Sequence, residues 1–361
     1  MNITTPYVKI DLNQVEKNIK DMINGLKSSG IAHRPHIKPH KSIDLAKLQI
    51  QLGAKGITCA KLSEAEVMAE AGIDDILLAF PVIGKENLER VIKLAGRVKL
   101  TCIIDSLVGA ESLSKAGEML GQKINVLIEI DGGIHRGGVQ PGEAVLQFAN
   151  QIKALPGLKI NGLFTYMGQI YGETTKEGMQ KTAASEAEIL QSAKKLLEEH
   201  GFQLSVLSGG STPSSIHHEQ LSGITESRAG NYIFYDMNAV HLGVIPIERC
   251  ALRIRSQVVS VPLPGYASID AGSKTLTSDG SLKDETFGYV VGRPGVKIVK
   301  LNEEHGFLRY DPNEDELEVG DQIEIIPNHS CVILNLNHRI YGFRGEALER
   351  ELTVEARGMN Y

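Results

Sequence analysis

Residues 34–41 read Arg-Pro-His-Ile-Lys-Pro-His-Lys, and this basic stretch decides how the rest of the chain is interpreted. Its two prolines lack an amide donor and hold the backbone extended, which predicts a strand end and not a helix. Side chains alternate along a strand, so four polar groups would share one face: Arg34, His36, Lys38 and His40. A lysine held among cations loses affinity for its proton and can act as an amine nucleophile that forms a Schiff base. The alternative for this stretch by itself is a basic surface loop.

Short apolar runs alternate with helical patterns around this stretch. Strands are predicted at residues 7–12, 34–41, 56–60, 75–80, 98–104, 124–130, 158–166 and 204–207. Helices are predicted at residues 13–26, 42–52, 85–95, 107–120, 143–155 and 176–200, and a further helix opens at residue 63. About eight βα repeats in some 240 residues predict a parallel sheet with crossover helices. Their number and length favour a closed (β/α)8 TIM-type barrel over an open doubly wound sheet.

The pattern changes near residue 244, where helical periodicity gives way to short runs separated by Gly, Pro and Asp turns. Strands are predicted at residues 252–261, 266–269, 288–292, 296–301, 306–310, 322–326, 331–334 and 353–356. The sequence therefore predicts two domains, a barrel over residues 1–243 and an all-β domain over residues 244–361.

The composition is that of an ordinary globular protein, with 42% hydrophobic and 23% charged residues. A formal net charge of -6 gives no reason to expect nucleic acid or an anionic membrane as a partner. No apolar run has the length of a membrane span, and the N-terminus lacks a signal-peptide pattern. The four cysteines are scattered, which fits a reducing cytoplasm better than a disulfide scaffold.

Two glycine-rich segments follow the last predicted strands of the barrel. They are Ser208-Gly-Gly-Ser-Thr212 and Arg228-Ala-Gly-Asn-Tyr232. Glycines let backbone amides approach an anion, and hydroxyls add donors. Many barrels bind phosphate after their last strands, at the C-terminal rim, so these segments are candidates for a phosphate site. Turns or helix caps are the alternative for either segment alone.

Two further candidates follow earlier strands. Arg136 lies in Asp131-Gly-Gly-Ile-His-Arg-Gly-Gly138, where its planar fork would suit a carboxylate or phenolate oxygen. Tyr166 ends the next strand and could stack on a ring or donate to it. The alternatives are a glycine-rich turn with a solvated arginine, and a structural tyrosine.

The β domain contains His329-Ser-Cys331. On a strand these two side chains would face the same way, and an imidazole with a thiolate suits Zn2+. Two protein ligands would leave positions open for water or a substrate hydroxyl, which is typical of a catalytic metal. Most pairs of this kind in sequences are incidental, so the pair by itself leaves both interpretations open.

As a set, these motifs resemble the D-threonine aldolase and D-serine dehydratase family of fold-type III pyridoxal-phosphate enzymes, whose barrel is shared with alanine racemase. The resemblance extends over residues 34–41, 131–138, 166–170, 208–213, 228–236, 269–275, 303–306 and 327–331. It implies that Lys38 binds the cofactor covalently and that Arg136 and Tyr166 contact its ring or phenolic oxygen. It implies a phosphate site at four residues: Ser211, Thr212, Gly230 and Asn231. It also implies that His329 and Cys331 hold a divalent metal (Zn, Mn or Mg) near the substrate's β-hydroxyl.

The implied enzyme is a cytoplasmic, homodimeric lyase that acts on β-hydroxy-D-amino acids, without nucleic acid or a membrane as partner. We expect a D-threonine aldolase-like cleavage to glycine and an aldehyde. The alternative is a D-serine dehydratase-like elimination to a keto acid and ammonia. Cys331 stands where the aldolases usually carry Asp, which favours a dehydratase, whereas residues 166–170 look like the aldolase branch, with Gln169 where a His often stands.

Three remoter alternatives share parts of this equipment. A non-catalytic pyridoxal-phosphate carrier typically lacks the β domain. An amino-acid racemase shares the barrel but has no use for the pair His329 and Cys331. A metal hydrolase could be built on His36 and His40.

Overall fold

A computed structural model describes residues 3–361, and the chain divides into two compact units. The barrel unit comprises Lys20–Lys38, Leu45–Gly230 and Met359–Tyr361. The β unit comprises residues 3–19, Pro39–Asp44 and Asn231–Gly358. These compact units do not test the predicted domain boundary between residues 243 and 244, which stays a prediction.

The described strands of the barrel unit form one eight-stranded parallel sheet. They are β2 (Ala32–His33), β3 (Ile57–Cys59), β4 (Asp75–Leu78), β5 (Lys99–Ile104), β6 (Ile124–Asp131), β7 (Leu158–Tyr166), β8 (Val206–Gly209) and β9 (Glu226–Ser227). Their order is β2-β9-β8-β7-β6-β5-β4-β3, and a parallel bridge between His36 and Thr58 joins its two ends. The predicted closed barrel is confirmed.

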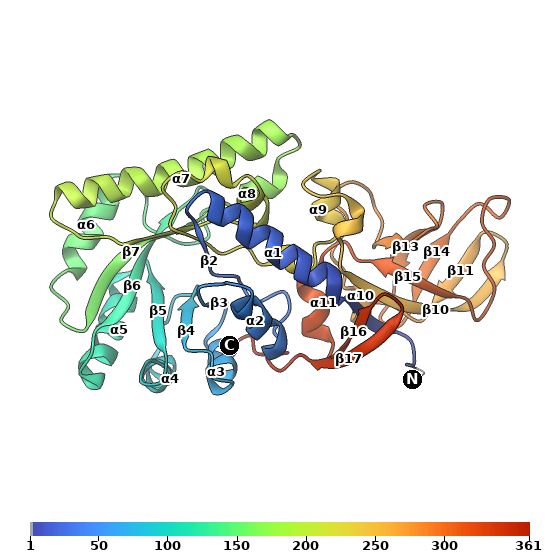
Figure 1. Cartoon of the computed structure of the whole chain (residues 1–361), viewed down its shortest axis with the longest axis horizontal. Coiled ribbons are helices and arrows are strands. Elements are labelled where there is room, and N and C mark those ends of the chain that lie inside the picture. The colour runs from blue at the N-terminus through green and yellow to red at the C-terminus, as the bar shows by residue number, and fades with distance from the viewer. Residues whose placement is uncertain (1–2) are drawn as a thin grey trace. The chain divides into compact units, whose positions relative to one another are not determined.

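Helices flank these strands in Figure 1. They are α2 (Ile43–Gln51), α3 (Leu62–Glu70), α4 (Lys85–Ala95), α5 (Leu107–Leu120), α6 (Glu143–Ile152), α7 (Lys176–Glu199) and α8 (Thr212–Ile216). Caps fix their ends: the Ser106 hydroxyl accepts the Gly109 N–H at the start of α5, and Gly121 ends that helix in a left-handed conformation. An apolar cluster from β4 to β7 packs together, and its members are Leu77, Ile103, Leu127 and Phe164.

The β unit contains a nine-stranded sheet within the described residues. Its strands are β1 (Tyr7–Asp11), β10 (Leu252–Leu263), β11 (Tyr266–Ile269), β12 (Tyr289–Val290), β13 (Lys297–Leu301), β14 (Gly306–Arg309), β15 (Gln322–Ile326), β16 (Arg339–Arg344) and β17 (Ala347–Thr353). The order is β11-β14-β13-β12-β15-β10-β1-β16-β17, and β11 also pairs with β10. This extra pairing closes the strands from β10 to β15 into a ring, which the sequence pattern did not predict.

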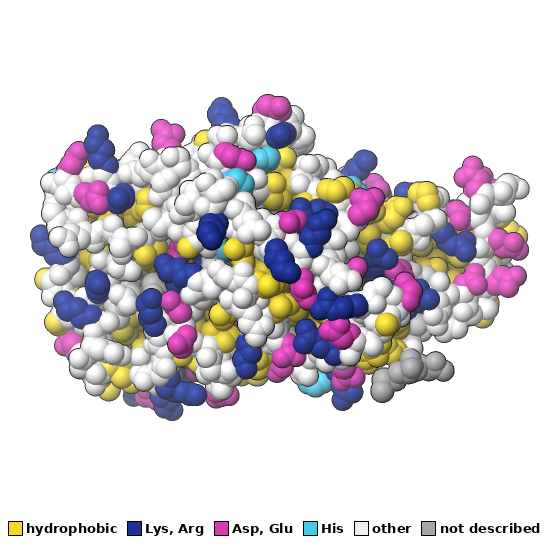
Figure 2. Space-filling view, in the orientation of Figure 1, with side chains coloured by type: hydrophobic (Ala, Val, Ile, Leu, Met, Phe, Trp, Pro, Cys, Tyr) yellow, Lys and Arg dark blue, Asp and Glu magenta, His cyan; other side chains and the backbone are white. Residues whose placement is uncertain are grey.

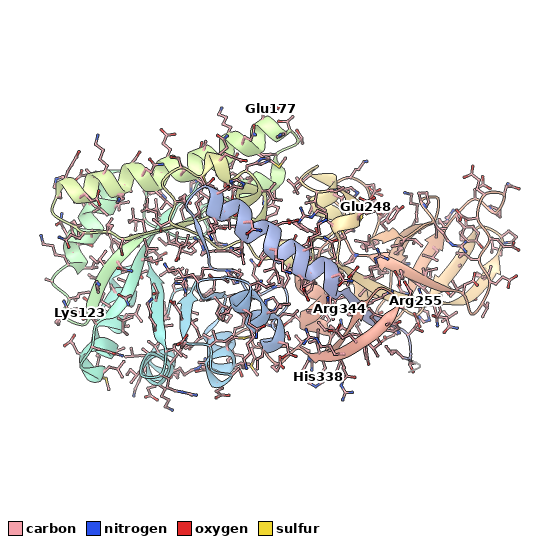
Figure 3. The ribbon with its side chains drawn as sticks, in the orientation of Figure 1. Lys123, Glu177, Glu248, Arg255, His338 and Arg344 are labelled. Carbon is pink, nitrogen blue, oxygen red and sulfur yellow. The ribbon has the colours of Figure 1, made fainter. Side chains whose placement is uncertain are left out.

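Ion pairs tie three strands of this sheet together. The Glu324 carboxylate on β15 accepts from Lys9 on β1 at 2.8 Å. It also accepts from Arg253 at 2.7 Å and from Arg255, labelled in Figure 3, at 3.3 Å. Both arginines lie on β10, so one acidic side chain links β15 to β10 and to β1. On the face drawn in Figure 2, basic and acidic side chains are mixed, as the modest net charge predicts.

The structure corrects several predicted elements. The predicted strand at residues 7–12 corresponds to β1 (Tyr7–Asp11) of the β unit and not to a barrel strand, and the eighth barrel strand is β9. Residues 331–334 are not a strand, because they lie in α11 (Ser330–Leu336). The predicted strand at 353–356 is also wrong, since β17 ends at Thr353, and β16 was missed. Short apolar runs fit a strand and a buried helix equally well, which explains the error at 331–334.

The β unit also holds the short helices α9 (Met237–His241) and α10 (Ser273–Leu276), and α1 (Leu12–Ser28) follows β1 along the chain. Short 3₁₀ turns occur at Gly168–Gly172, His218–Gln220, Asn231–Ile233 and Ile247–Arg249. Within residues 3–361, no helix combines the length and the apolar character that a membrane crossing requires.

Candidate active site

Five adjacent strands of the barrel carry candidate residues at their C-terminal ends. These strands are β2, β9, β8, β7 and β6, and they are consecutive in the order of the sheet. Because all are parallel, their C-terminal ends lie on one rim of the barrel. The structure therefore brings six predicted residues of the barrel unit to this rim: Lys38, Arg136, Tyr166, Ser211, Thr212 and Gly230.

The side chain of Lys38 is exposed. Its backbone is held on the N-terminal side, because the Lys38 N–H lies 3.4 Å from His36 Nδ1, and the His36 N–H donates to the Ala229 carbonyl at 3.2 Å. Lys38 thus extends from a segment that is tied to β3 and to the loop after β9. An amine on an anchored backbone with an accessible side chain is suited to a covalent bond with a carbonyl compound.

The predicted cationic face of residues 34–41 is not observed. Arg34 is buried, with Nη1 at 2.6 Å from Asp75 Oδ1 and Nε at 3.1 Å from Glu226 Oε2. His40 is fully buried, and its Nδ1 accepts the Ser42 N–H at 3.1 Å. The predicted strand at residues 34–41 is wrong, because β2 ends at His33 and residues 38–40 form a turn. Arg34 is therefore a structural residue, which joins the first residues of β4 and β9.

Arg136 and Tyr166 lie against each other. The guanidinium carbon is 4.6 Å from the centre of the tyrosine ring, within the range of a cation–π contact. Arg136 Nη2 lies 3.7 Å from Glu129 Oε1 on β6. Burial raises the pKa of Glu129, and the charge of Arg136 opposes this shift. Arg136 remains about half exposed, so its fork is accessible to an anionic oxygen at the rim.

The loop after β6 is organised by the carboxylate of Asp131. Its Oδ1 accepts the N–H groups of Gly133 and His135, and its Oδ2 contacts His135 Nδ1 at 2.5 Å and Gln140 Nε2 at 2.9 Å. Burial would raise the pKa of Asp131, but the hydrogen bonds from Gln140 and His135 lower it well below its usual range. Asp131 thus fixes the loop from which Arg136 extends. Gln169 donates to the Gly132 carbonyl at 2.7 Å and braces the same loop.

The glycine segment after β8 is tightly packed. Gly210 has φ +85°, and a Cβ there would lie 2.8 Å from Ser227 Oγ, so only glycine fits. Its N–H donates to the buried Glu186 Oε1 at 2.9 Å. The Ser211 hydroxyl pairs with Ser214 in a capping box at the start of α8. Ser211 and Thr212 are consequently held in one orientation, and both are almost fully buried.

Arg228 occupies the barrel interior below this segment. Its Nη1 donates to Ser208 Oγ at 2.8 Å, its Nη2 donates to the Thr165 carbonyl at 2.6 Å, and its guanidinium carbon lies 3.6 Å from the Phe164 ring centre. Burial lowers the pKa of Arg228 to about 10, against the charge of Glu186. Sequence reasoning gave neither residue a role. Arg228 was visible only as part of a motif, and Glu186 lies within a long helix with no local signal.

In the β unit, His329 and Cys331 lie next to each other. His329 is the extended N-cap residue of α11, and Cys331 lies in the first turn of that helix. The hydrogen bond to Cys331, with the charges of Asp236 and Asp279, raises the pKa of His329 to about 9, although burial opposes this shift. The side chain of Asn231 donates to Asp236 Oδ2 at 2.6 Å and to Ser330 Oγ at 2.9 Å. A phosphate contact of Asn231 would therefore fall to its backbone N–H.

The donor sets fit the implied cofactors. An exposed amine, an arginine stacked on a tyrosine, and packed glycine and hydroxyl segments on one rim match an aldehyde, a phenolic ring and a phosphate. An imidazole beside a thiol matches Zn2+. No group of three or more metal-ligating side chains occurs within residues 3–361, so this pair would leave coordination positions open.

Comparisons with known proteins point to the same chemistry. Residues 10–238 match the family described as "Alanine racemase, N-terminal domain", and residues 251–343 match "Putative serine dehydratase domain". The chain is 32% identical to a D-threonine aldolase from Arthrobacter sp, over 99% of this chain and 94% of that protein. It is 33% identical to a D-threo-3-hydroxyaspartate dehydratase from Delftia sp. (strain HT23), over 92% of each.

Solved structures agree with this match. The crystal structure of D-threonine aldolase from Filomicrobium marinum aligns with a TM-score of 0.92 at 30% identity, covering 99% of this chain and 97% of that one. Solved structures of D-threo-3-hydroxyaspartate dehydratase include a variant with one histidine replaced by alanine. They also include a metal-free form in which the cysteine two positions further is replaced. This chain belongs to the family of D-threonine aldolases and D-serine dehydratases with an alanine racemase-like barrel, and it is a pyridoxal-phosphate-dependent lyase.

Proposed function

We propose that this lyase cleaves β-hydroxy-D-amino acids to glycine and an aldehyde, and that it requires a divalent metal as well as pyridoxal phosphate. The observation that carries the proposal is the rim of the barrel, where an exposed lysine follows one strand and the stacked pair of Arg136 and Tyr166 follows strands of the same sheet. The similarity to D-threonine aldolases over almost the whole chain supports the reaction type.

In this proposal, Lys38 holds the cofactor covalently through Nζ. Arg136 and Tyr166 contact the ring or its phenolic oxygen. Ser211, Thr212 and the backbone of Gly230 and Asn231 hold the phosphate. When bound, pyridoxal phosphate supplies the electron sink that stabilises negative charge at the substrate's Cα.

The metal would be held by His329 and Cys331 and would polarise the β-hydroxyl of the substrate. The adjacency of the two side chains supports this assignment. The variants of D-threo-3-hydroxyaspartate dehydratase, in which a histidine and a cysteine two positions apart are replaced, support it further. A thiolate ligand favours Zn2+ over Mg2+ or Mn2+.

A dehydratase is the second candidate, and a specific observation favours it. Cys331 matches the metal pair of the dehydratases, and Gln169 cannot take a proton from a β-hydroxyl, because an amide does not titrate and this one donates to Gly132. In an elimination, Lys38 Nζ would instead remove the proton from Cα. Residues 166–170 favour the aldolase branch of the family, and for this reason we propose the aldolase reaction as the first candidate.

One incubation separates the two reactions. D-Threonine, with pyridoxal phosphate and ZnCl2 added, is expected to give glycine and acetaldehyde in equal amounts. 2-Oxobutanoate and ammonia would instead establish the dehydratase. A parallel sample contains D-threo-3-hydroxyaspartate, which extends the test to a second substrate side chain. In that sample an aldolase would give glycine and glyoxylate, whereas a dehydratase would give oxaloacetate and ammonia. Turnover of neither substrate would overturn both reactions.

We also propose that the enzyme is a cytoplasmic homodimer. Free cysteines at positions 59, 102, 250 and 331 support a reducing compartment. Exposed apolar side chains at the ends of β4 and β5 support self-association. We call these four residues, which follow the two strands in the chain, the rim patch: Phe80, Ile83, Leu107 and Val108.

A further inference from the structure

We propose that Asp279 is a positioning residue for the metal centre: its carboxylate holds the His329 ring so that Nε2 is the nitrogen that binds the metal. This inference rests on the proposed metal site and assigns it an additional residue. Asp279 lies 50 positions before His329 in the chain, in a segment with no metal-ligand motif.

The geometry of the pair carries the first step. His329 Nδ1 lies 3.2 Å from Asp279 Oδ2. The negative charge of that oxygen keeps a proton on the nearby Nδ1, so a metal that displaces a ring proton takes the one on Nε2. Histidine ligands to metals typically donate their second N–H to a carboxylate or carbonyl, and this contact fixes the tautomer and the ring orientation. Asp279 therefore stands where such a partner is expected.

The segment that carries Asp279 is anchored next to His329. Asn328 Nδ2 donates to the carbonyls of Asp279 at 3.3 Å and Thr286 at 2.6 Å. Asn328 is buried and directly precedes His329 in the chain. The same side chain thus ties both ends of the segment 279–286 to the backbone of the metal pair, which keeps Asp279 in register with the imidazole.

A second anchor comes from α9, and the turn into the segment is unusual. The Leu282 N–H donates to Asn238 Oδ1 at 2.9 Å. Thr277 has φ +66°, a conformation that β-branched residues rarely adopt, and its Oγ1 accepts the Asp279 N–H at 3.1 Å. A strained residue persists only where its surroundings hold it, so the fold maintains this conformation two residues before Asp279.

The other carboxylate near His329 has a different task. Asp236 Oδ2 accepts the Ser330 N–H at 2.9 Å and the Asn231 amide, and Oδ1 accepts the Ala239 N–H at 3.0 Å. Asp236 therefore fixes the backbone at the starts of α9 and α11. Asp279 is left as the carboxylate that contacts the imidazole itself.

The test is the affinity of the full-length, pyridoxal-phosphate-loaded protein for Zn2+, measured by competition with a chromogenic chelator. We expect Asp279→Ala to weaken Zn2+ binding by about 10- to 100-fold. Asp279→Asn keeps an acceptor oxygen without the charge, so its loss is expected to be smaller than that of Asp279→Ala. The matched control is Asp284→Asn, which removes a carboxylate from the same segment that bonds Thr286 and not His329. It is expected to bind Zn2+ like the parent.

The urea midpoint of the metal-free protein distinguishes a role of Asp279 in metal binding from a role in the stability of the fold. We expect this midpoint to be unchanged in Asp279→Ala and Asp279→Asn. Parent-like Zn2+ affinity in both variants, or a loss that accompanies a shifted midpoint, would overturn the inference. His329→Ala separates the two proposals. Parent-like affinity in that variant would sink the metal site itself, whereas a loss there with none in the Asp279 variants would sink only the role of Asp279.

Discussion

At the scale of single residues, accessibility decides which lysine of the basic stretch can bind the cofactor at the rim of the barrel. Lys38 and Lys41 lie three positions apart in the same basic stretch, but Lys38 is exposed whereas Lys41 is buried. Exposure of the amine makes Lys38 the one that a carbonyl compound can reach, and its truncation removes no core packing.

We predict that Lys38→Ala folds with a free energy of unfolding within about 0.5 kcal/mol of the parent. It should nevertheless purify without the visible absorbance of bound pyridoxal phosphate. Borohydride reduction of the parent, followed by mass spectrometry of its peptides, should place the cofactor on Lys38. A label on Lys41, or a variant that stays yellow after gel filtration, would contradict the assignment.

The choice of metal is also a property of one residue. Replacing Cys331 by Asp exchanges a soft thiolate for a hard carboxylate, so we expect Cys331→Asp to bind less Zn2+ and relatively more Mn2+ than the parent. The bound metals are counted after equilibration with equal concentrations of both ions. Cys331→Ser, which removes the thiolate without adding a carboxylate, serves as the control and should lose Zn2+ without gaining Mn2+. An unchanged ratio in Cys331→Asp would show that this side chain is not a ligand.

At the scale of elements, the short strands of the barrel are held by charges. Glu226 Oε2 accepts from Arg34, and Oε1 accepts from Ser208 Oγ at 2.9 Å. Glu226→Gln leaves Arg34 buried with one carboxylate fewer, so we expect a loss of about 3–5 kcal/mol in the free energy of unfolding. Lys55→Ala removes a largely exposed partner of the same carboxylate and should cost less than about 1 kcal/mol. Urea denaturation of both variants measures the difference, and equal costs would contradict this account.

The loop after β6 gives a pH-dependent prediction. Asp131→Asn removes the charge that accepts four hydrogen bonds, so we expect it to cost about 2 kcal/mol at pH 7. Because the pKa of folded Asp131 is lowered, its stabilisation is complete above the ordinary value near 3.8 and is lost as the pH falls through the folded value. The cost of the substitution should therefore be the same at pH 7 and pH 5 and should shrink below about pH 4. A cost in urea unfolding that stays constant at pH 7, at pH 5 and below about pH 4 would refute the charge as its cause.

Sequence patterns predicted the regular elements well and the polar ones poorly. The bounds of α4, α5 and β7 follow from apolar periodicity and caps, and the structure has them where they were predicted. Strand β9 was missed because Glu226-Ser227 has no apolar signature and is held by Arg34. The order of the strands was enough to place the loops at the rim. It could not predict the contacts of buried Arg34 with Asp75 and Glu226, or the contact of Asp279 with His329, because these residues lie far apart in the sequence. Those contacts depend on tertiary packing that no local pattern encodes.

At the scale of the whole molecule, we propose that the boundary near residue 243 separates two domains, with β1 added to the second. The two family matches, over residues 10–238 and 251–343, support a boundary in this region. Because β1 pairs with β10 and β16, the first strand of the chain completes a sheet made mostly of its last hundred or so residues. Such non-local pairing predicts that the second half of the chain cannot complete its sheet without the N-terminal residues.

The last prediction concerns self-association. We expect a mass by light scattering of twice that of the chain, at tens of micromolar protein, because a patch of exposed apolar side chains on one rim favours burial against a second copy. Val108 is 62% exposed and belongs to the rim patch, so Val108→Asp should shift the mass towards that of the single chain. Met119 is 65% exposed on the same helix, α5, but lies outside the rim patch. Met119→Asp adds the same charge and should leave the mass of the parent unchanged. Equal effects of the two variants would show that the rim patch is not the contact between the two copies. A parent protein with the mass of a single chain would overturn the proposed homodimer.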